Sequence, residues 1–492
     1  MKNLGFFLLI SLITVFFSCR REDDLTTDSS ARLSFSLDTL TFDTVFTQLG
    51  STTERFTIRN NNDQMVRISS ISLREGSNSQ FRFNVDGISG YSVKDLEIRG
   101  GDSAFVFVEV TVDPTNQSSP LVVLDAIEFE TNGNHQEVIL EAWGQDAYYY
   151  TSLYDVPGFP PLSFISDYYP NQINVLLPND KPHVIFDYLV VDSLVNLTIQ
   201  EGTQIHFYRD GGLWAYRGSN LQVQGTMGNE VVFQGYRTED YYNELPGQWD
   251  RIILNESPRD HVFEYAIIKN GYIGISAESY YLDGNFQLAP NNLVLNNTVI
   301  QSMEGLGLLT RNYNVKANNS LFVDAQNQLV ALLGGGDCDF IHCTLANYWS
   351  YGNRQEATVY ASNIFEISPY QVVGDLDVYF GNSIIYGSGS EELEADSVDD
   401  GDFNLLFDHC AVRTELTESE VSWFSNTLIN PESDFGYGNP FFLNLGDDDF
   451  SLYSTSVAVD AGDPNITGAL TIDLAGNTRD NLPDIGSYEY IP

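Results

Sequence analysis

The densest group of potentially reactive side chains lies between Asp337 and Cys343, where two cysteines, one histidine and two aspartates fall within seven residues. Thiolate, imidazole and carboxylate groups are the usual ligands of zinc. On a strand, however, the neighbouring His342 and Cys343 point to opposite faces, and no second Cys/His group lies nearby in the sequence. We therefore expect these residues to belong to the core rather than to a metal site.

The pairing of the cysteines is open. Cys338, Cys343 and Cys410 are the cysteines that follow Cys19. In an oxidising compartment Cys343 could form a disulfide with either Cys338 or Cys410, which would leave one thiol buried.

A second group of charged residues lies near the end of the chain, where four aspartates surround Arg479 in sequence: Asp460, Asp463, Asp473 and Asp484. We expect these carboxylates to converge on the guanidinium as a buried ion-pair network. The alternative is a calcium ion, because calcium prefers carboxylate and carbonyl oxygens. The sequence requires no cofactor, and calcium is the one that it would fit.

Three longer segments between expected strands each carry a pair of neighbouring aromatic residues: Tyr241 and Tyr242, Tyr280 and Tyr281, and Tyr348 and Trp349. If these pairs continue strands, alternation turns one member of each outward, and an outward ring can stack on a sugar. The alternative is that the rings pack inward as the cores of their loops. The six residues are our candidates for glycan binding.

The elements that must position these residues are short strands with Gly-containing turns, first seen between Leu197 and Gly235. A similar phrase of one small or polar residue before an apolar pair then recurs, at Ala266, Thr298, Ser320, Thr344, Asn363 and Ser383. The intervals are 32, 22, 24, 19 and 20 residues, which is the length of one supersecondary unit in a repeat protein. Units this short cannot bury their own apolar face, so neighbouring units must stack. The pattern predicts a parallel β-helix.

At this point the chain resembles the right-handed parallel β-helix proteins of the pectate-lyase-like group. The resemblance implies polysaccharide lyase or glycoside hydrolase activity as one expectation. A lyase needs a base and a cation or cationic side chain, but the charged residues on or near the expected coils form no recognisable set: Arg251, Lys269, Arg311, Lys316, Asp283 and Asp324. The motifs of β-helix polygalacturonases, Asn-Thr-Asp, Gly-His-Gly and Arg-Ile-Lys, do not occur in the sequence.

The stretch from about Arg32 to Gln145 alternates apolar and polar residues, with turn clusters such as Asn60 to Asp63 between the runs. This pattern predicts an antiparallel sandwich of about seven strands. Phe56-Thr-Ile-Arg-Asn, Val112-Asp-Pro and Glu128-Phe-Glu-Thr-Asn resemble the bacterial Ig-like domains of the hydin type. The resemblance implies a spacer or docking module.

The segment from Ala147 to Tyr188 is rich in proline, which argues against regular strands inside a sheet. We expect it to be a junction or a cap that covers the first coil. At the other end, Ser456-Val-Ala-Val-Asp-Ala-Gly-Asp and Pro483-Asp-Ile-Gly-Ser-Tyr-Glu resemble the C-terminal region of choice-of-anchor Q proteins. We expect that region to close the last coil.

The first 19 residues combine Lys2, an apolar run from Leu4 to Phe17, and Ser18-Cys19. This arrangement resembles a bacterial lipoprotein signal and implies that Cys19 is the lipid anchor; an ordinary secretory signal is the alternative. The short, charged and acid-rich run directly after Cys19, Arg20-Arg21-Glu22-Asp23-Asp24, resembles the signal that sends Bacteroidota lipoproteins to the cell surface. It would also suit a solvated tether.

The overall charge excludes one class of partner. The sequence has 23 Lys and Arg against 68 Asp and Glu, a formal net charge of −45. A field of this sign repels phosphate backbones, so we expect no nucleic-acid binding.

We therefore predict an all-β protein in which an Ig-like β-sandwich is followed by a right-handed parallel β-helix. The expected order is a signal peptide (1–19), a tether (20–31), the sandwich (32–146), a junction (147–188), the β-helix (189–438) and a closing segment (439–492). The expected function is glycan or macromolecule binding without catalysis at the outer-membrane surface, with a polysaccharide or surface protein as partner. The alternative is a carbohydrate-active enzyme, a polysaccharide lyase or glycoside hydrolase.

Overall fold

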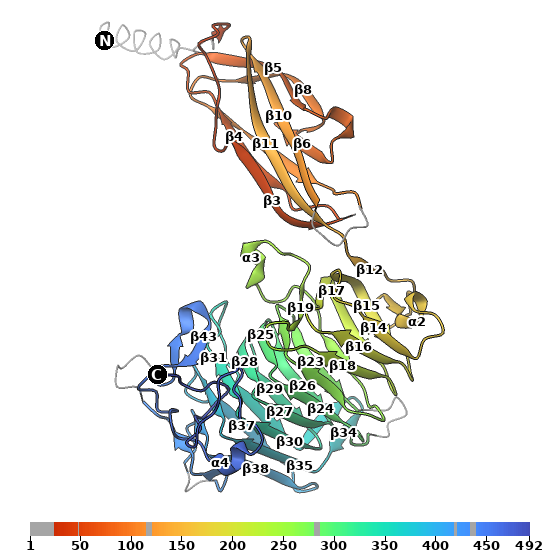
Figure 1. Ribbon diagram of the computed structural model, residues 1–492, viewed down its shortest axis with the longest axis vertical. Helices are drawn as coiled ribbons and strands as arrows, with labels where there is room; N and C mark the ends of the chain where they lie inside the picture. The colour runs from red at the N-terminus through yellow and green to blue at the C-terminus, as the bar shows by residue number, and fades with distance from the viewer. Residues whose placement is uncertain (1–23, 48, 115–120, 280–285, 418–420, 433–438) are drawn as a thin grey trace, which may run out of the picture. The chain divides into compact units, whose positions relative to one another are not determined.

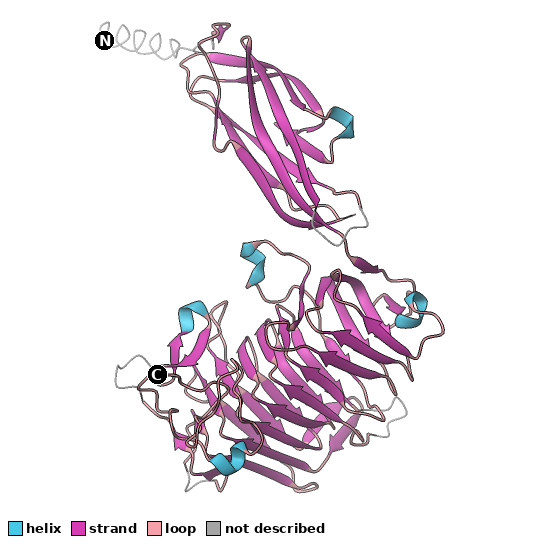
Figure 2. Ribbon diagram, in the orientation of Figure 1, coloured by secondary structure: helices cyan, strands magenta, loops and turns pink. Residues whose placement is uncertain are grey.

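The computed structural model describes residues 24–47, 49–114, 121–279, 286–417, 421–432 and 439–492. Most of these residues lie in strands (Figure 2). The chain divides into two compact units, Met1–Asp146 and Ala147–Pro492, and each is described here by itself.

The N-terminal unit is built from two mostly antiparallel sheets that share one apolar core. One sheet has the order β1 (Leu25–Thr26), β5 (Met65–Leu73), β10 (Leu121–Thr131), β11 (Asn134–Gln145) and β3 (Thr39–Phe46), and β8 (Ser92–Ile98) also pairs with β5. The other has the order β2 (Ser34–Phe35), β4 (Glu54–Arg59), β9 (Ser103–Val110), β6 (Phe81–Val85) and β7 (Ile88–Gly90). Alternate residues of these strands are buried, as in Phe81, Phe83 and Val85 of β6. The predicted alternation is therefore the cause of this core.

The C-terminal unit consists of long parallel sheets whose strands form three rows (Figure 1). Row 1 is β14 (Asn174–Leu177), β16 (Asn196–Gln200), β18 (Asn220–Gln224), β21 (His261–Glu264), β24 (Asn292–Asn296), β27 (Asn314–Asn318), β30 (Gly336–Ile341), β35 (Leu376–Gly381), β38 (Phe403–Asp408) and β40 (Phe424–Ser425). Row 2 is β12 (Tyr148–Tyr150), the first parts of β15 (His183–Val191) and β17 (Gln204–Ala215), β19 (Val231–Gly235), β22 (Ala266–Lys269), β25 (Val299–Met303), β28 (Leu321–Ala325), β31 (Thr344–Asn347), β36 (Ile384–Gly387), β39 (Ala411–Val412) and β41 (Leu428–Ile429). Row 3 is β13 (Leu162–Phe164), the second parts of β15 and β17, β20 (Ile252–Leu254), β23 (Ile273–Glu278), β26 (Leu306–Arg311), β29 (Val330–Leu333), β32 (Val359–Ser362) and β37 (Leu393–Asp396). One strand per row makes one coil, an arrangement consistent with a parallel β-helix.

The interior of this unit is filled by residues stacked from coil to coil. Phe340, Phe380 and Phe407 are consecutive register partners in row 1. Their ring centroids lie 4.6 Å and 5.1 Å apart with nearly parallel planes. These distances follow the spacing between neighbouring strands, so each ring packs on the next without a change of backbone.

The backbone conformation of the turn from row 1 to row 2 explains why asparagine recurs in the repeated sequence motif. One residue at this corner has a left-handed backbone, with φ between 47° and 51° in Asn297, Asn319, His342, Asn382, His409 and Asn426. Asparagine tolerates this conformation better than other residues with a side chain. Asn319 also donates from Nδ2 to Oδ1 of Asn297 at 3.4 Å.

The residue after each corner points inward and forms a ladder of small side chains: Ala266, Thr298, Ser320, Cys343, Ser383, Cys410 and Thr427. Two of the predicted repeat positions differ from this ladder. The sequence pattern predicts Thr344 at the ladder position between Ser320 and Ser383, but Cys343 occupies it. Asn363 is not in the ladder, because the residues after it form an antiparallel hairpin of β33 (Ile364–Ile367) and β34 (Tyr370–Val373).

The proline-rich segment supplies the first coil itself, because β12, β13 and β14 lie within it and begin the three rows. The expectation that this segment has no regular sheet strands is therefore wrong. Its helix α2 (Ile165–Tyr168) buries Ile165 in the main core, and the ring of Tyr168 meets that of Tyr150 of β12 edge to face at 4.8 Å. The C-terminal segment carries β42 (Phe442–Asn444), β43 (Asp449–Leu452) and α4 (Pro464–Thr467). It packs apolar residues such as Phe441 and Ile485 on outward side chains of β28, β31 and β36, so it covers the flank of several coils and not the last coil alone.

Candidate functional site

The first of the aromatic pairs lies on a short helix outside the coils. Tyr241 and Tyr242 belong to α3 (Asp240–Asn243), and their rings meet edge to face at 5.1 Å. Tyr241 is 73% exposed, and the guanidinium of Arg237 lies 3.6 Å from the centroid of the Tyr242 ring. Tyr280 and Tyr281 lie outside the described residues.

The third aromatic pair packs inward. Trp349 is buried, and the Tyr348 ring meets Phe442 edge-on at 6.4 Å. The exposed ring of this loop is Tyr351, whose hydroxyl donates to the carbonyl oxygen of Glu244 at 3.0 Å. This bond joins the loop to the segment that carries α3, so the structure brings two of the three aromatic excursions together.

A groove of about 400 Å³ lies on the outer face of row 3. We call it the row 3 groove, and it is lined by Phe159, Pro160, Tyr188, Trp214, Asp250, Arg251, Ile253, Asn255, Glu278 and Arg311. Trp214 and Ile253 are register partners on β17 and β20. Because their neighbours Leu213, Ala215 and Ile252 fill the interior, alternation turns Trp214 and Ile253 outward.

The aromatic wall of the row 3 groove is held in place. Phe159 stacks on Trp214 with ring centroids 5.9 Å apart and an interplanar angle of 25°. The indole Nε1 of Trp214 donates to Oδ1 of Asn255 at 2.8 Å. Phe159 remains 46% exposed, so its ring is available to a ligand in the groove.

Two ion pairs form the polar part of the groove. Nη1 of Arg311 lies 2.6 Å from Oε2 of Glu278, and Nε of Arg251 lies 2.9 Å from Oδ1 of Asp250. The second oxygen of Glu278 accepts the Ser276 hydroxyl, and that of Asp250 accepts the hydroxyl of Tyr188. Burial raises the pKa of the Tyr188 hydroxyl, and the negative charge of Asp250 raises it further. Tyr188 therefore keeps its proton and acts as a hydroxyl donor.

These groups suit a polyhydroxylated ligand. Aromatic faces pack against the C–H groups of a sugar ring, and guanidinium and carboxylate groups bond neighbouring hydroxyls. The paired charges are fixed before a ligand arrives, which lowers the entropic cost of binding. Arg251 and Arg311 were identified in the sequence only as possible parts of a lyase set; Tyr188, Trp214, Asp250 and Glu278 were not identified. The signal that could have found them is the alternation along row 3, which marks Trp214 as outward.

The C-terminal aspartates are only partly brought together. Arg479 is buried with Glu489, Asp473 and Asp484 around it, and its Nη1 lies 3.3 Å from Oε2 of Glu489. Asp473 accepts the backbone N–H of Glu489, and Asp484 accepts those of Asp460 and Tyr490. The described contacts therefore form an ion-pair and hydrogen-bond network.

Asp460 and Asp463 make different contacts from those of Asp473 and Asp484. Asp460 contributes its backbone N–H to Asp484, and the Asp463 carboxylate accepts the backbone N–H of Asn465 at the start of α4. Burial raises the pKa of Asp484 to about 6. Calcium binding by the four aspartates stays a prediction.

The cysteines and His342 are buried. Cys338, Cys343 and Cys410 are free thiols. Ser383 stands between Cys343 and Cys410 in the inward ladder, so their backbones are two strand spacings, roughly 9–10 Å, apart and beyond disulfide reach. Nε2 of His342 lies 2.8 Å from Oγ1 of Thr467, so this ring fastens the C-terminal segment to the coils.

One group of possible metal ligands, Glu128, His135 and Glu137, lies on the N-terminal unit with its ligand atoms within 4.8 Å of one another. Arg74 already pairs with both glutamates, at 3.1 Å from Glu128 and in close contact with Glu137. His135 bonds Glu130 at 2.8 Å. An arginine between the carboxylates makes this group a surface ion-pair network.

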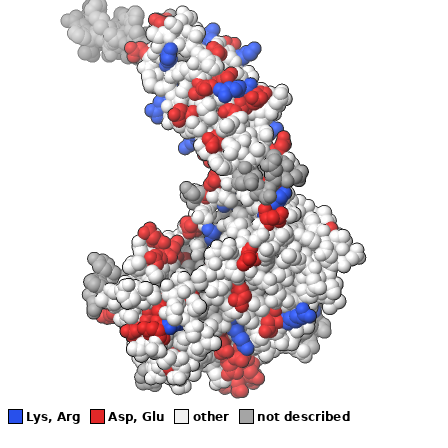
Figure 3. All heavy atoms as spheres, in the orientation of Figure 1, with Lys and Arg blue, Asp and Glu red and all other residues white. Residues whose placement is uncertain are grey.

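The surface charge follows the composition. On the face that Figure 3 shows, acidic side chains of the described residues are spread over both units, and no continuous patch of Lys and Arg is present there. Within the described ranges, none of the helices has the length and apolar character needed to cross a membrane.

No known protein family matches the sequence, and no curated protein is similar to it. Among solved structures, the chain is similar to a family 123 glycoside hydrolase from Clostridium perfringens, with 10% identity over 23% of this chain and 26% of that chain and a TM-score of 0.17. It is also similar to a PapD-like domain of human CEP192, with 11% identity, 25% and 89% coverage and a TM-score of 0.17. A third similar structure is the E. coli chaperone DraB, with 9% identity, 24% and 55% coverage and a TM-score of 0.17. Scores this low carry no argument about function.

Proposed function

We propose that this protein is a bacterial surface lipoprotein that binds glycan in the row 3 groove without catalysing a reaction on it. The observation that carries the proposal is the stacked pair of Phe159 and Trp214 beside two fixed ion pairs in one groove. Such a combination offers both the apolar face and the hydrogen-bonding groups that a sugar requires. The exposed Tyr241 and Tyr351 would extend the glycan-binding surface beyond the groove.

The proposed setting follows from sequence. Ser18-Cys19 after an apolar run supports lipidation of Cys19, and the acidic residues that follow support export to the outer face of the outer membrane. The three rows of parallel strands support a right-handed β-helix of the pectate-lyase-like group. The two sheets around one core support an Ig-like N-terminal domain, and the C-terminal segment fits a choice-of-anchor Q region.

A carbohydrate-active enzyme is the second candidate, because Asp250 and Glu278 line the same groove. A glycoside hydrolase uses two carboxylates on either side of the bond that it cleaves. Each of the four carboxylate oxygens here already has a hydrogen-bond partner in Arg251, Tyr188, Arg311 or Ser276. Because both carboxylates are engaged in this way, we favour a binding function over a catalytic one.

The two candidates separate in one experiment. The protein without residues 1–19 is incubated with neutral and acidic polysaccharides, with and without calcium, and unsaturated products, new reducing ends and binding are measured. We expect binding without product. Product that disappears in Glu278→Gln or Asp250→Asn would establish the enzyme instead, and calcium dependence of an unsaturated product would identify a lyase.

A further inference from the structure

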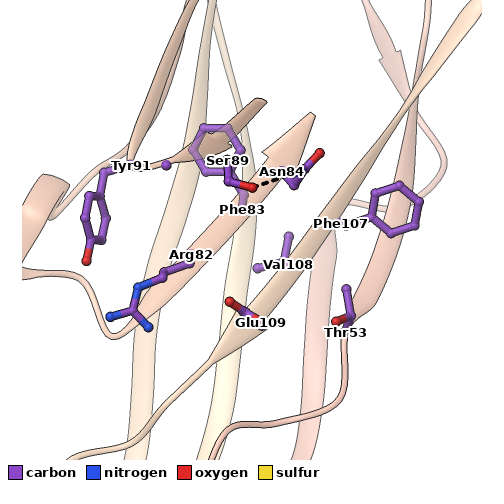
Figure 4. A pocket seen from close by; sticks show the side chains of 10 residues that line it. Thr53, Arg82, Phe83, Asn84, Ser89, Tyr91, Phe107, Val108 and Glu109 are labelled. Atoms are coloured by element: carbon purple, nitrogen blue, oxygen red, sulfur yellow. Dashed lines mark hydrogen bonds between the residues drawn. The ribbon is translucent and has the colours of Figure 1, made fainter. Parts of the chain in front are cut away.

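The N-terminal unit has a groove of its own, with a volume of about 660 Å³ (Figure 4). It lies over β6, β7 and β9 in the second sheet of that unit, and Thr53, just before β4, also lines it. Pockets for small ligands fall in this size range. It shares no lining residue with the row 3 groove.

Aromatic side chains lie on both sides of this groove. Figure 4 shows Tyr91 and Phe107 at opposite sides, with Arg82 and Glu109 between them. Phe107 is 39% exposed although it belongs to a strand of the sheet. Because its neighbours Val106 and Val108 are buried in the core, alternation turns the Phe107 ring into the groove.

Two opposite charges face the groove without pairing. Arg82 and Glu109 are direct register partners on β6 and β9, so their side chains leave the same face of the sheet. Within the part of the chain that the structure describes, no ion pair joins them. The guanidinium donors and the carboxylate acceptors are therefore both open to a ligand.

The polar edge of the groove is fixed by local bonds. Nδ2 of Asn84 donates to the Ser89 hydroxyl oxygen at 2.7 Å, and Oδ1 of Asn84 accepts the backbone N–H of Gly87 at 3.1 Å. The Ser89 hydroxyl keeps its own proton to donate. This edge thus presents one oriented donor beside the two charged groups.

We propose that this groove is a second carbohydrate site and that it takes a neutral sugar residue. A pair of neighbouring hydroxyls can accept from Arg82 and donate to Glu109 at the same time, while the C–H face of the ring packs on Phe107. The floor carries one positive and one negative charge, so it offers no net attraction to an acidic chain. A uronate carboxylate that approached Arg82 would also lie close to Glu109, so the attraction and the repulsion would largely cancel.

The test uses the protein without residues 1–19 and carrying Trp214→Ala, which removes the aromatic wall of the row 3 groove. Binding of neutral oligosaccharides is measured by titration calorimetry before and after adding Phe107→Ala or Arg82→Gln. We expect the Trp214→Ala protein to bind with one site, and each added change to weaken that binding about tenfold. Trp143→Ala is the control, because Trp143 is also a surface aromatic, 43% exposed, on the other sheet of the same unit.

The outcomes separate this proposal from the function of the row 3 groove. If Trp214→Ala alone abolishes all binding, the second site is overturned and the row 3 groove stands. If Trp214→Ala has no effect and Phe107→Ala abolishes binding, the second site stands and the row 3 groove fails. Equal binding by the Phe107→Ala, Arg82→Gln and Trp143→Ala proteins would overturn the second site. Tighter binding of acidic than of neutral oligosaccharides in the same titration would also overturn it.

Discussion

Arg311 of β26 and Glu278 of β23 are register partners on neighbouring coils, and their side chains meet at 2.6 Å. The parallel pairing of the coils therefore places the two charges side by side on the outer face of row 3. The same pairing sets Trp214 beside Ile253. The groove is a product of coil register, since none of these contacts joins residues that are close in sequence.

The first prediction concerns the energy of that ion pair. A double-mutant cycle with Arg311→Met and Glu278→Gln should give a coupling energy of about 1–2 kcal/mol, because the two side chains are 31% and 10% exposed and only partly screened by water. The measurement is the urea midpoint of each variant. Arg67 and Glu97 form the control pair, at 47% and 40% exposed, for which coupling should be below about 1 kcal/mol. Equal coupling in both pairs would contradict the prediction.

A second prediction concerns the buried pair of Arg354 and Glu392. Both Glu392 oxygens are bonded to the guanidinium, at 2.5 Å and 2.7 Å, and Thr358 adds a third bond. Glu392→Ala leaves the guanidinium buried without its partner, which should cost about 3–5 kcal/mol of unfolding free energy. Replacing both residues with Met should cost much less. Denaturation curves for the two variants test this, and a double variant as unstable as Glu392→Ala would refute it.

Acid should weaken the C-terminal unit through its buried histidines. Nδ1 of His261 accepts the backbone N–H of Leu221 at 3.1 Å, so the ring must be neutral there, and burial lowers its pKa from 6.5 to about 4. Because the folded pKa lies below the unfolded one, the stability that this ring contributes is complete above pH 6.5 and is lost as the pH falls towards 4. The loss for this one group is about 3 kcal/mol.

The measurement for this prediction is the denaturation midpoint at pH 7, 5.5 and 4.5, for the natural chain and for His261→Gln. The variant should show a smaller fall in stability across this window. His135→Gln serves as the control, because His135 lies at the surface. An identical pH dependence in all three proteins would show that His261 does not titrate as proposed.

The fourth prediction concerns the cysteines. Cys343 stands in the inward ladder between Ser320 and Ser383. Cys343→Ser therefore introduces a hydroxyl at a place where the neighbouring hydroxyls already form hydrogen bonds. We expect it to lower the free energy of unfolding by less than about 1 kcal/mol. Cys338 stands between Val315 and Val378. Cys338→Ser therefore buries a hydroxyl in an apolar row and should cost about 1–3 kcal/mol. Thermal unfolding compares the two, and the reverse order would contradict the assignment of the ladder.

The parallel strands could be predicted from the sequence because each coil repeats the same local requirement. A residue that tolerates positive φ, such as Asn297 or Asn319, is followed by a small inward residue and an apolar pair. The same local rule gave a wrong prediction at Asn363, because the apolar pair that follows it belongs to β33 (Ile364–Ile367), which forms a hairpin with Tyr370–Val373. Only the partner strand distinguishes the two structures, and a local pattern does not contain it.

The groove could not be predicted for a related reason. Phe159, Trp214 and Arg311 are brought together from positions about 50 to 150 residues apart in the sequence, and their meeting depends on the register of four successive row 3 strands. The neighbouring aromatic pairs were easier to see in the sequence. Trp349 of one pair is nevertheless buried, and the exposed ring is Tyr351, because contacts with Phe442 and Glu244 decide how that loop folds.

The central claim is that Trp214 forms a sugar-binding wall, and the most direct measurement is the affinity of the Trp214→Ala protein for the polysaccharide that the natural chain binds best. Trp143→Ala is measured beside it, with circular dichroism to establish that both variants are folded. The account predicts that Trp214→Ala weakens binding by about tenfold or more, since an aromatic contact contributes about 1 kcal/mol beyond its buried area, and that Trp143→Ala binds like the natural chain. Equal affinity for the natural chain and both variants would contradict the account.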